Sequence, residues 1–355
     1  MLRTTKNLLA LLIAAFLGTT LATCVGPPAS HWAKQAKREC PFAPDESITT
    51  HVVLGYQVIP NGDAVVQGQR MLETCMPNAS IEWKRFDSAG ELLQAYGSNS
   101  IDYGLLGSSA LARGLSQPLS LSLKTPWVFD EIGTAESLVA KDPAVKKIQD
   151  LKGKSIAVTF SSTSHYSLLG ALKQAGMKVG EDVKLINLSP DRMLAGWQSD
   201  QIDAAWVWDP TLSKLTENGH IITSSKESAQ GGAPTYDLAT FTSDFVKNNP
   251  EFLTVWARAQ NAAALEIKNE PEKAAASMSP LLGLEPAMIV QQMKGYSYPL
   301  AQQQASPELL GGNLGTVLVD TANFLLENRE IQAVSQPDVY KQAPYPEAAR
   351  AVEGK

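Results

Sequence analysis

Residues that commonly perform catalysis or bind metals are scarce in this 355-residue chain, which has four histidines and three cysteines. It has no His-Glu-x-x-His or Cys-x-x-Cys spacing, so we expect no metal and no cofactor. Ser109 lacks the Gly-x-Ser-x-Gly frame of a hydrolase nucleophile. Gly153-Lys154-Ser155 resembles the end of a phosphate-binding loop, but Ile148 stands where that loop needs a glycine. These absences argue against an enzyme.

Positive charge and long apolar runs are scarce as well. Lysine and arginine number 30 against 36 acidic residues, for a net charge of −6, and no basic face indicates a nucleic-acid partner. The apolar run at residues 8–21 is shorter than the roughly 20 residues that cross a bilayer. Because Arg3 and Lys6 precede this run and small residues follow it, the pattern predicts a secretory signal peptide over residues 1–23. An uncleaved membrane anchor is the alternative.

The three cysteines all lie in the first quarter of the chain. Leu-Ala-Thr-Cys at the end of the signal resembles a lipoprotein signal, in which Cys24 would carry lipid. Thr23 is unusual at that position, so ordinary cleavage near Ala22 is an equal alternative. In an oxidising compartment we expect Cys40 and Cys75 to form a disulfide, with two unpaired thiols as the alternative.

Regular structure begins after a proline-rich tether at residues 24–47. From there, β-prone runs alternate with helical periodicity, which is typical of an α/β fold with a parallel sheet covered on both faces. The expected strands are 52–57, 81–86, 101–106, 155–160, 183–188, 202–208 and 236–241. The expected helices include 63–73, 88–96, 164–175, 210–218, 252–267, 271–278, 287–293 and 314–326.

The strand–helix pattern restarts at residue 155, which predicts two lobes. A helical tail after residue 250 cannot bury its apolar faces alone, so we expect it to pack back on the first lobe. The second lobe is then an insertion. Lobe 1 is predicted over 48–138 and 232–355, and lobe 2 over 139–231. Two crossovers between such lobes form a double hinge around a cleft that can close on a ligand.

Two hydroxyl-rich turns each follow an apolar strand and open a helix: Gly107-Ser108-Ser109, and Ser-Ser-Thr-Ser-His at residues 161–165. The free N–H groups of a helix start, with rotatable hydroxyls beside them, can hold an anion without a lysine or arginine. Plain helix capping is the alternative for both turns. Their shared position at strand ends, where open α/β sheets bind ligands, favours a binding site.

Two acids and a tryptophan complete the candidates. Glu136 and Asp237 lie near the predicted crossovers at the back of the cleft, where an acid can face the cation of a ligand. Solvent exposure is the alternative for each. Trp206 and Trp208 stand on one strand and could both belong to the core. Trp208 is nearer the strand end and is our candidate for a pocket wall.

Several segments resemble a known family. In order, FDSAGELLQAYGSNSIDYGLLGSSAL, GKSIAVTFSSTSHYSLLGALKQAGMK, AGWQSDQIDAAWVWDPTL, GGAPTYDLATF and VDTANFLLE resemble the taurine-binding proteins of bacterial ABC importers, within the sulfonate/nitrate-type periplasmic binding family. The similarity runs from about His51 to Glu327. It implies a two-lobed, type II periplasmic binding protein fold and a periplasmic location. It also implies an inner-membrane ABC permease as partner, and we expect a monomer.

The resemblance assigns roles to the candidate residues. The sulfonate of the ligand should contact Ser108, Ser109, Thr163 and His165. The ammonium should contact Asp237 with help from Glu136. Gln57, just after the first strand, should line the pocket.

Three departures from the family pattern leave the ligand open: VIPNGDAVV at 58–66, Asp209, and PWVFDEIG at 126–133. An alkylsulfonate, an aromatic sulfonate or nitrate could replace taurine. From other functional classes, the alternatives are an enzyme on the same fold that uses His165 and a receptor domain that feeds a sensor.

Overall fold

The computed structural model describes residues 39–353. The predicted signal peptide, Cys24 and most of the tether lie outside the described residues. The expected disulfide between Cys40 and Cys75 is present and ties the start of the described chain to the end of the second helix. None of the helices in residues 39–353 is long and apolar enough to cross a membrane.

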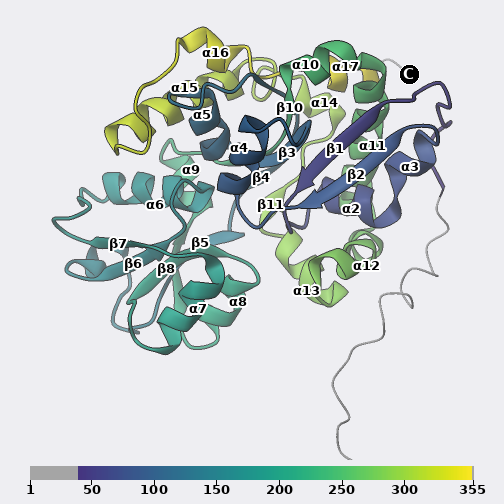
Figure 1. Cartoon of the computed structure of the whole chain (residues 1–355). Helices are drawn as coiled ribbons and strands as arrows, with labels where there is room; N and C mark the ends of the chain where they lie inside the picture. Colours follow the sequence, from purple (N-terminus) through teal and green to yellow (C-terminus); the bar gives the residue numbers. More distant parts are fainter. Residues whose placement is uncertain (1–38, 354–355) are drawn as a thin grey trace, which may run out of the picture. The chain divides into compact units, whose positions relative to one another are not determined.

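The larger sheet has six strands within the described residues, in the order β11-β4-β10-β3-β1-β2. β1 (His51–Tyr56) is parallel to β2 (Ser80–Arg85) and β3 (Tyr103–Gly107). β10 (Tyr236–Thr242) runs antiparallel between β3 and β4 (Leu123–Ile132), and the short β11 (Tyr296–Ser297) is antiparallel to β4. Figure 1 shows β1, β2 and β3 side by side in this sheet.

The smaller sheet has five described strands, in the order β7-β6-β8-β5-β9. β6 (Ser155–Val158) is parallel to β7 (Lys184–Asn187) and β8 (Ala204–Trp208). β5 (Glu136–Ala140) is antiparallel to β8 and to β9 (His220–Ser224). Both sheets are therefore mixed, which corrects the expectation of a parallel sheet. β5 and β10 each begin directly after a crossover, at the edge of the sheet where the neighbouring strands end, and they are therefore antiparallel to those strands.

Helices cover both sheets. Around the larger sheet are α2 (Gly62–Gln69), α3 (Met71–Cys75), α4 (Ala89–Gly97), α5 (Ser108–Leu115) and α10 (Ser243–Asn248). The tail adds α11 (Pro250–Asn269), α12 (Pro271–Leu282), α13 (Pro286–Met293), α14 (Ala301–Gln304), α15 (Asn313–Glu327), α16 (Pro337–Lys341) and α17 (Glu347–Glu353). Contacts of α11 and α12 with α2, and of α15 with α5, attach this tail to the larger sheet.

The smaller sheet carries α6 (Thr163–Gln174), α7 (Pro190–Gln198), α8 (Thr211–Thr216) and α9 (Ser225–Gln230), with a 3₁₀ turn at Ile148–Leu151. β5 belongs to this sheet although it begins before the predicted boundary at residue 139. We propose that each sheet with its helices forms one lobe. Lobe 1 would be the larger sheet and lobe 2 the smaller, with crossovers at residues 133–135 and 231–235.

Each sheet has an apolar core on both of its faces, as buried strands require. Tyr103 and Leu105 of β3 point into one core of the larger sheet, and Leu106 points into the other. In the smaller sheet, Trp206 of β8 points into one core and Val207 into the other. The two sheets are thereby rigid supports for the residues at their strand ends.

Candidate functional site

A cavity of about 530 Å³ is lined by residues of both sheets. Strands of both sheets end at this cavity, with Gln57 just after β1, Gly107 ending β3, Asn187 ending β7 and Trp208 ending β8. The two reversed strands begin at the same edge and bring Glu136 and Asp237 to it. The carboxyl ends of sheet strands are the usual place for ligands in open α/β folds.

Glu136 is buried and held by hydroxyl groups of lobe 2. Thr163 Oγ1 donates to its Oε1 at 2.5 Å, and Ser225 Oγ donates to its Oε2 at 3.3 Å. Burial raises the pKa of Glu136 to about 7; the Thr163 hydrogen bond opposes this rise and the charge of Asp237 adds to it. No lysine or arginine of the described residues pairs with this carboxyl, so a ligand's cation can fill that place.

Asp237 has a second acid beside it. Asp130 of β4 and Asp237 of β10 are in-register neighbours, and both are buried. Apart from Asp237, no hydrogen-bond partner for either Asp130 oxygen occurs in residues 39–353. Burial raises the pKa of both acids, and the charge of Asp237 raises that of Asp130 further. Sequence reasoning missed Asp130, although it lies in PWVFDEIG, a segment that departs from the family pattern.

The turn that opens α6 is ordered by its own side chains. Ser162 Oγ accepts from His165 N–H at 3.2 Å, which is an N-cap, and Ser161 N–H donates to His165 Nδ1 at 3.3 Å. His165 stacks on Phe160 with ring centroids 4.5 Å apart. Burial lowers the pKa of His165 to about 4, so the imidazole is neutral at pH 7. The capping interpretation therefore applies to Ser162 and does not exclude ligand contacts by the helix start.

The turn that opens α5 lies directly against the α6 turn. A Cβ atom at Gly107 would stand 2.7 Å from Thr163 Cγ2, so the close approach of the two helix starts needs a glycine there. Ser108 Oγ accepts from Tyr236 N–H at 3.3 Å. Ser109 Oγ is buried and has no hydrogen-bond partner within the described residues. An unpaired buried hydroxyl at a helix start is a donor available to an anion.

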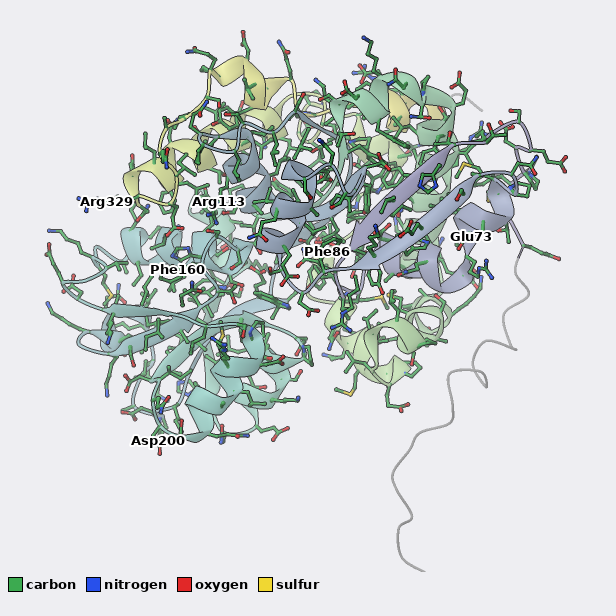
Figure 2. The ribbon with its side chains drawn as sticks, viewed as in Figure 1. Glu73, Phe86, Arg113, Phe160, Asp200 and Arg329 are labelled. Atoms are coloured by element: carbon green, nitrogen blue, oxygen red, sulfur yellow. A yellow bond between two sulfur atoms is a disulfide. The ribbon has the colours of Figure 1, made fainter. Side chains whose placement is uncertain are left out.

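Two arginines that sequence reasoning missed also line the cavity. Arg113, in the last turn of α5, donates from Nη1 to Ser161 Oγ at 2.7 Å and so joins α5 to the turn that opens α6. Figure 2 labels Arg113, which belongs to α5, and Phe160, which lies between β6 and α6. Arg192 of α7 is exposed and forms no ion pair with a described residue. Arg113 sits one helical turn after Ser109, a spacing that could have identified it.

Of the eight predicted ligand residues, five line the cavity: Gln57, Glu136, Thr163, Trp208 and Asp237. The other three, Ser108, Ser109 and His165, are buried beside it in the two turns. Gln57 is anchored, since its Nε2 donates to the Leu105 carbonyl at 2.9 Å. Among the described residues no group of three or more metal-binding side chains occurs.

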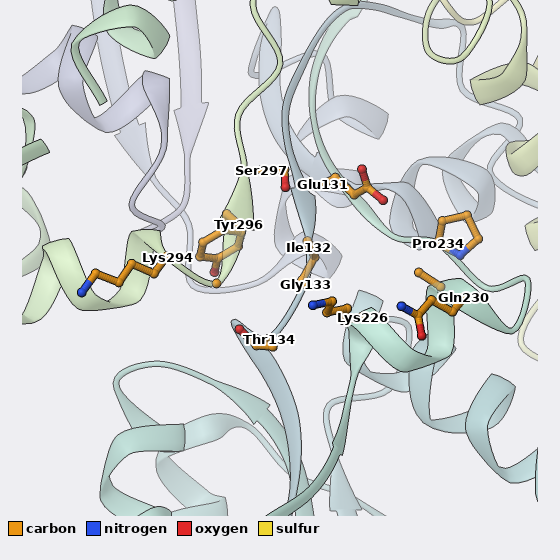
Figure 3. A pocket seen from close by; sticks show the side chains of 12 residues that line it. Glu131, Ile132, Gly133, Thr134, Lys226, Gln230, Pro234, Lys294, Tyr296 and Ser297 are labelled. Atoms are coloured by element: carbon orange, nitrogen blue, oxygen red, sulfur yellow. The ribbon is translucent and has the colours of Figure 1, made fainter. Parts of the chain in front are cut away.

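A second cavity of about 490 Å³ lies at the crossovers (Figure 3). Its lining includes Glu131 and Gly133 of the first crossover region, Lys226 of α9 and Lys294 after α13. Tyr296 lines both cavities. None of the predicted ligand residues lines this second cavity, whereas Glu136 and Asp237 line the first one.

The fold and the cavity at the strand ends are those of a two-lobed periplasmic binding protein. Residues 93–274 match the NMT1/THI5 like family. The taurine-binding periplasmic protein of Escherichia coli (strain K12) is 34% identical over 301 residues, which cover 83% of this chain and 92% of that relative. The chain belongs to this family of binding proteins.

Two solved structures share the fold at lower identity. The periplasmic aliphatic sulphonate binding protein SsuA from Escherichia coli matches with a TM-score of 0.70 and 22% identity, over 82% of this chain and 97% of that chain. The desulfurization enzyme DSZB matches with a TM-score of 0.63 and 14% identity, over 86% of this chain and 99% of that chain. The fold therefore serves both binding proteins and enzymes.

Proposed function

We propose that this protein captures taurine, or a closely related aminosulfonate, in the periplasm and delivers it to an ABC permease of the inner membrane. One observation carries this proposal: a single cavity is lined by buried acids without a cationic partner, and the unpaired hydroxyl of Ser109 lies buried beside it at a helix start. Taurine carries an ammonium and a sulfonate two carbons apart, so it matches both groups at once. The 34% identity to a taurine-binding protein supports the same ligand.

The cation of the ligand would be held by Asp237 and Glu136. A ligand ammonium supplies the positive charge that these buried carboxyls lack, and a buried charge is stable only when it is paired. Thr163 and Ser225 fix Glu136 through hydroxyl donors, which leaves the side of the carboxyl that faces the cavity for the ligand. Trp208 would form a wall beside this group.

The sulfonate would be held where α5 and α6 begin. Ser109 offers its unpaired hydroxyl, and the first N–H groups of each helix have no partner within the helix. The hydroxyl of Thr163 serves Glu136, so its backbone N–H is the donor that we assign to the anion. Ser108, His165 and Gln57 would shape the same region. Arg113 adds a guanidinium, whose planar donors suit sulfonate oxygens.

Export and the other partners belong to the same proposal. A signal at residues 1–23 would direct the chain to the periplasm, with Cys24 either lipidated or removed. We expect a monomer that meets its permease after ligand capture. Nucleic acid has no role in this function.

Ligand screening tests the proposal directly. Calorimetry of the mature protein should show taurine binding more tightly than ethanesulfonate, sulfate or nitrate. A ligand at 100 times its Kd stabilises the folded state by about 2.7 kcal/mol and a weaker ligand at the same concentration by less, so thermal midpoints measured at one ligand concentration should rank the ligands in the same order. Stronger binding of nitrate or sulfate than of taurine would replace the aminosulfonate with a simple anion.

An enzyme on this fold is the second candidate, because DSZB shares it. His165 is the residue that such an enzyme would use. Its Nδ1 accepts from Ser161 N–H and its pKa is low, which makes it a poor base at pH 7. Mass spectrometry of the ligand recovered from the screen should find it unchanged; turnover abolished by His165→Ala would establish an enzyme instead.

A further inference from the structure

Asp130 and Asp237 are neighbouring acids, but only one of them can contact a ligand. The two residues are opposite each other on β4 and β10. Asp237 lines the cavity, whereas Asp130 is fully buried and does not. A ligand can therefore contact Asp237, and Asp130 can act on the ligand only through Asp237.

Two adjacent carboxyl groups without a cation cannot both be ionised in a dry setting. An ionised Asp130 would be a buried charge with no donor among the described residues. A protonated Asp130 has an O–H that can donate to the Asp237 carboxylate. Burial and the charge of Asp237 both raise the pKa of Asp130, which is the direction that this arrangement requires. The same hydrogen bond opposes the rise that burial causes in the pKa of Asp237.

The other titratable groups around Asp237 do not replace this donor. Glu136 is itself an acid. Tyr103 donates its hydroxyl to Asp63, and Tyr298 donates to the Pro60 carbonyl. Tyr296 is also near, and burial together with the neighbouring acids holds its pKa well above the ordinary value. No described lysine or arginine forms an ion pair with Asp237.

We propose that Asp130 is a positioning residue of the ligand site: it stays protonated and donates a hydrogen bond that holds Asp237 as the carboxylate facing the ligand's cation. This inference rests on the proposed function for the identity of the ligand, but not for the location of the proton.

Two substitutions of Asp130 test whether its side chain donates a hydrogen bond to Asp237. Asp130→Asn keeps a side-chain N–H donor for Asp237, whereas Asp130→Ala removes it. Calorimetry from pH 5.5 to 8 should show taurine binding to Asp130→Ala weakened roughly tenfold at pH 7, as expected for one hydrogen bond to a charged group. The pH at which taurine affinity is half lost should move upward in this variant. Asp130→Asn should stay within about threefold of the wild type and keep its midpoint, and ethanesulfonate should bind all three proteins alike.

The opposite results overturn the inference. An ionised Asp130 would make Asp130→Asn shift the midpoint downward, and a purely structural Asp130 would weaken taurine and ethanesulfonate equally with no shift. A readout without ligand tests the proton alone: infrared spectra at pH 7.5 should show a protonated carboxyl C=O band that Asp130→Asn removes. If this band is present but taurine fails to bind, the proposed function fails and the proton assignment stands. If the band is absent, the inference is wrong even when taurine binds.

Discussion

Two groups of buried acids in and around the larger sheet are built differently. Asp63, in the first turn of α2, is fully surrounded by protein and accepts hydrogen bonds from Tyr103 Oη at 2.8 Å and from Gln260 Nε2 at 3.1 Å. Asp130, in contrast, has no hydrogen-bond partner among the described residues apart from Asp237. Burial raises the pKa of every one of these carboxyls. The difference lies in whether the fold itself supplies the partners.

We propose that this difference distinguishes a core residue, Asp63, from a ligand residue, Asp237. Asp63 lines none of the cavities described above, and its donors complete its hydrogen bonding within the lobe. Asp237 lines the cavity and lacks a cation. Native proteins satisfy nearly all buried polar groups, so a group left incomplete at a cavity indicates a missing partner from outside the chain. Asp63 and Asp237 are therefore a matched pair for testing the site.

The largest effect should come from Asp237→Asn. Burying a ligand ammonium without its carboxylate typically costs about 2–5 kcal/mol, and each 1.4 kcal/mol is about tenfold in Kd. Taurine should therefore bind about 30-fold more weakly or worse. Ethanesulfonate has no amine, and its affinity should be kept or improved. Calorimetry with both ligands on both proteins measures this.

Asp63→Asn is the matched control for that experiment, since it makes the same chemical change at a buried acid away from the cavity. Its taurine affinity should equal that of the wild type. Equal losses of both ligands in Asp237→Asn would make Asp237 structural, and no loss of either would place it outside the site. A loss of taurine affinity in Asp63→Asn would remove the contrast between the two groups.

The contrast between the two acid groups could be predicted only in part from sequence. Most strands and helices were expected close to their observed ranges, because a parallel strand and its helix are local units with clear periodicity. β4 was not expected. It contains Pro126 and two adjacent acids, Asp130 and Glu131, so it has neither the alternation nor the apolar run of a typical strand. Its pairing with β10, which is distant in sequence, makes it a strand.

The candidate site shows the same limit. Glu136, Thr163 and Asp237 were predicted from the hydroxyl-rich turn and the crossovers, the resemblance then assigned their roles, and all three line the cavity. Asp130 was missed because nothing local indicates that an acid inside a strand faces another acid more than 100 residues away. Arg113 was missed because its role depends on contact between two lobes. Long-range pairing decides these residues, and a single sequence does not contain that information.

A change of pH gives the next largest effect. Taurine needs ionised carboxyls, and burial raises the pKa of Glu136 to about 7. Affinity should therefore fall as the pH is lowered through this value, by about tenfold from pH 8 to pH 6 for one carboxyl that must ionise. Ethanesulfonate should lose no affinity over that range. Parallel pH series by calorimetry check this, and equal pH dependence for both ligands would contradict an ammonium site at these acids.

The smallest effect concerns the stability of the folded protein and returns to Asp63. Burial raises the pKa of Asp63 to about 7 in the folded state, far above its value in an unfolded chain. Between these two values the folded state binds a proton that the unfolded state does not, so stability is greater at low pH and is lost as the pH rises through about 7. From pH 6 to pH 8 this group should contribute a loss of about 1 kcal/mol.

The acids of the cleft should add their own loss over the same range in the absence of ligand. Saturating taurine keeps Glu136 and Asp237 ionised in the folded protein as they are in the unfolded chain, so their contribution to the pH dependence disappears while the contributions of Asp63 and Asp130 remain. Urea unfolding at pH 6 and pH 8 should thus show a smaller pH dependence with taurine than without it. It should fall further in Asp63→Asn with taurine, where the proton that we assign to Asp130, released only on unfolding, accounts for most of the pH dependence that remains. Asp63 would instead be already ionised in the folded protein if taurine-bound Asp63→Asn kept the same pH dependence of unfolding as the taurine-bound wild type. The two acid groups would then differ in charge and not only in their partners.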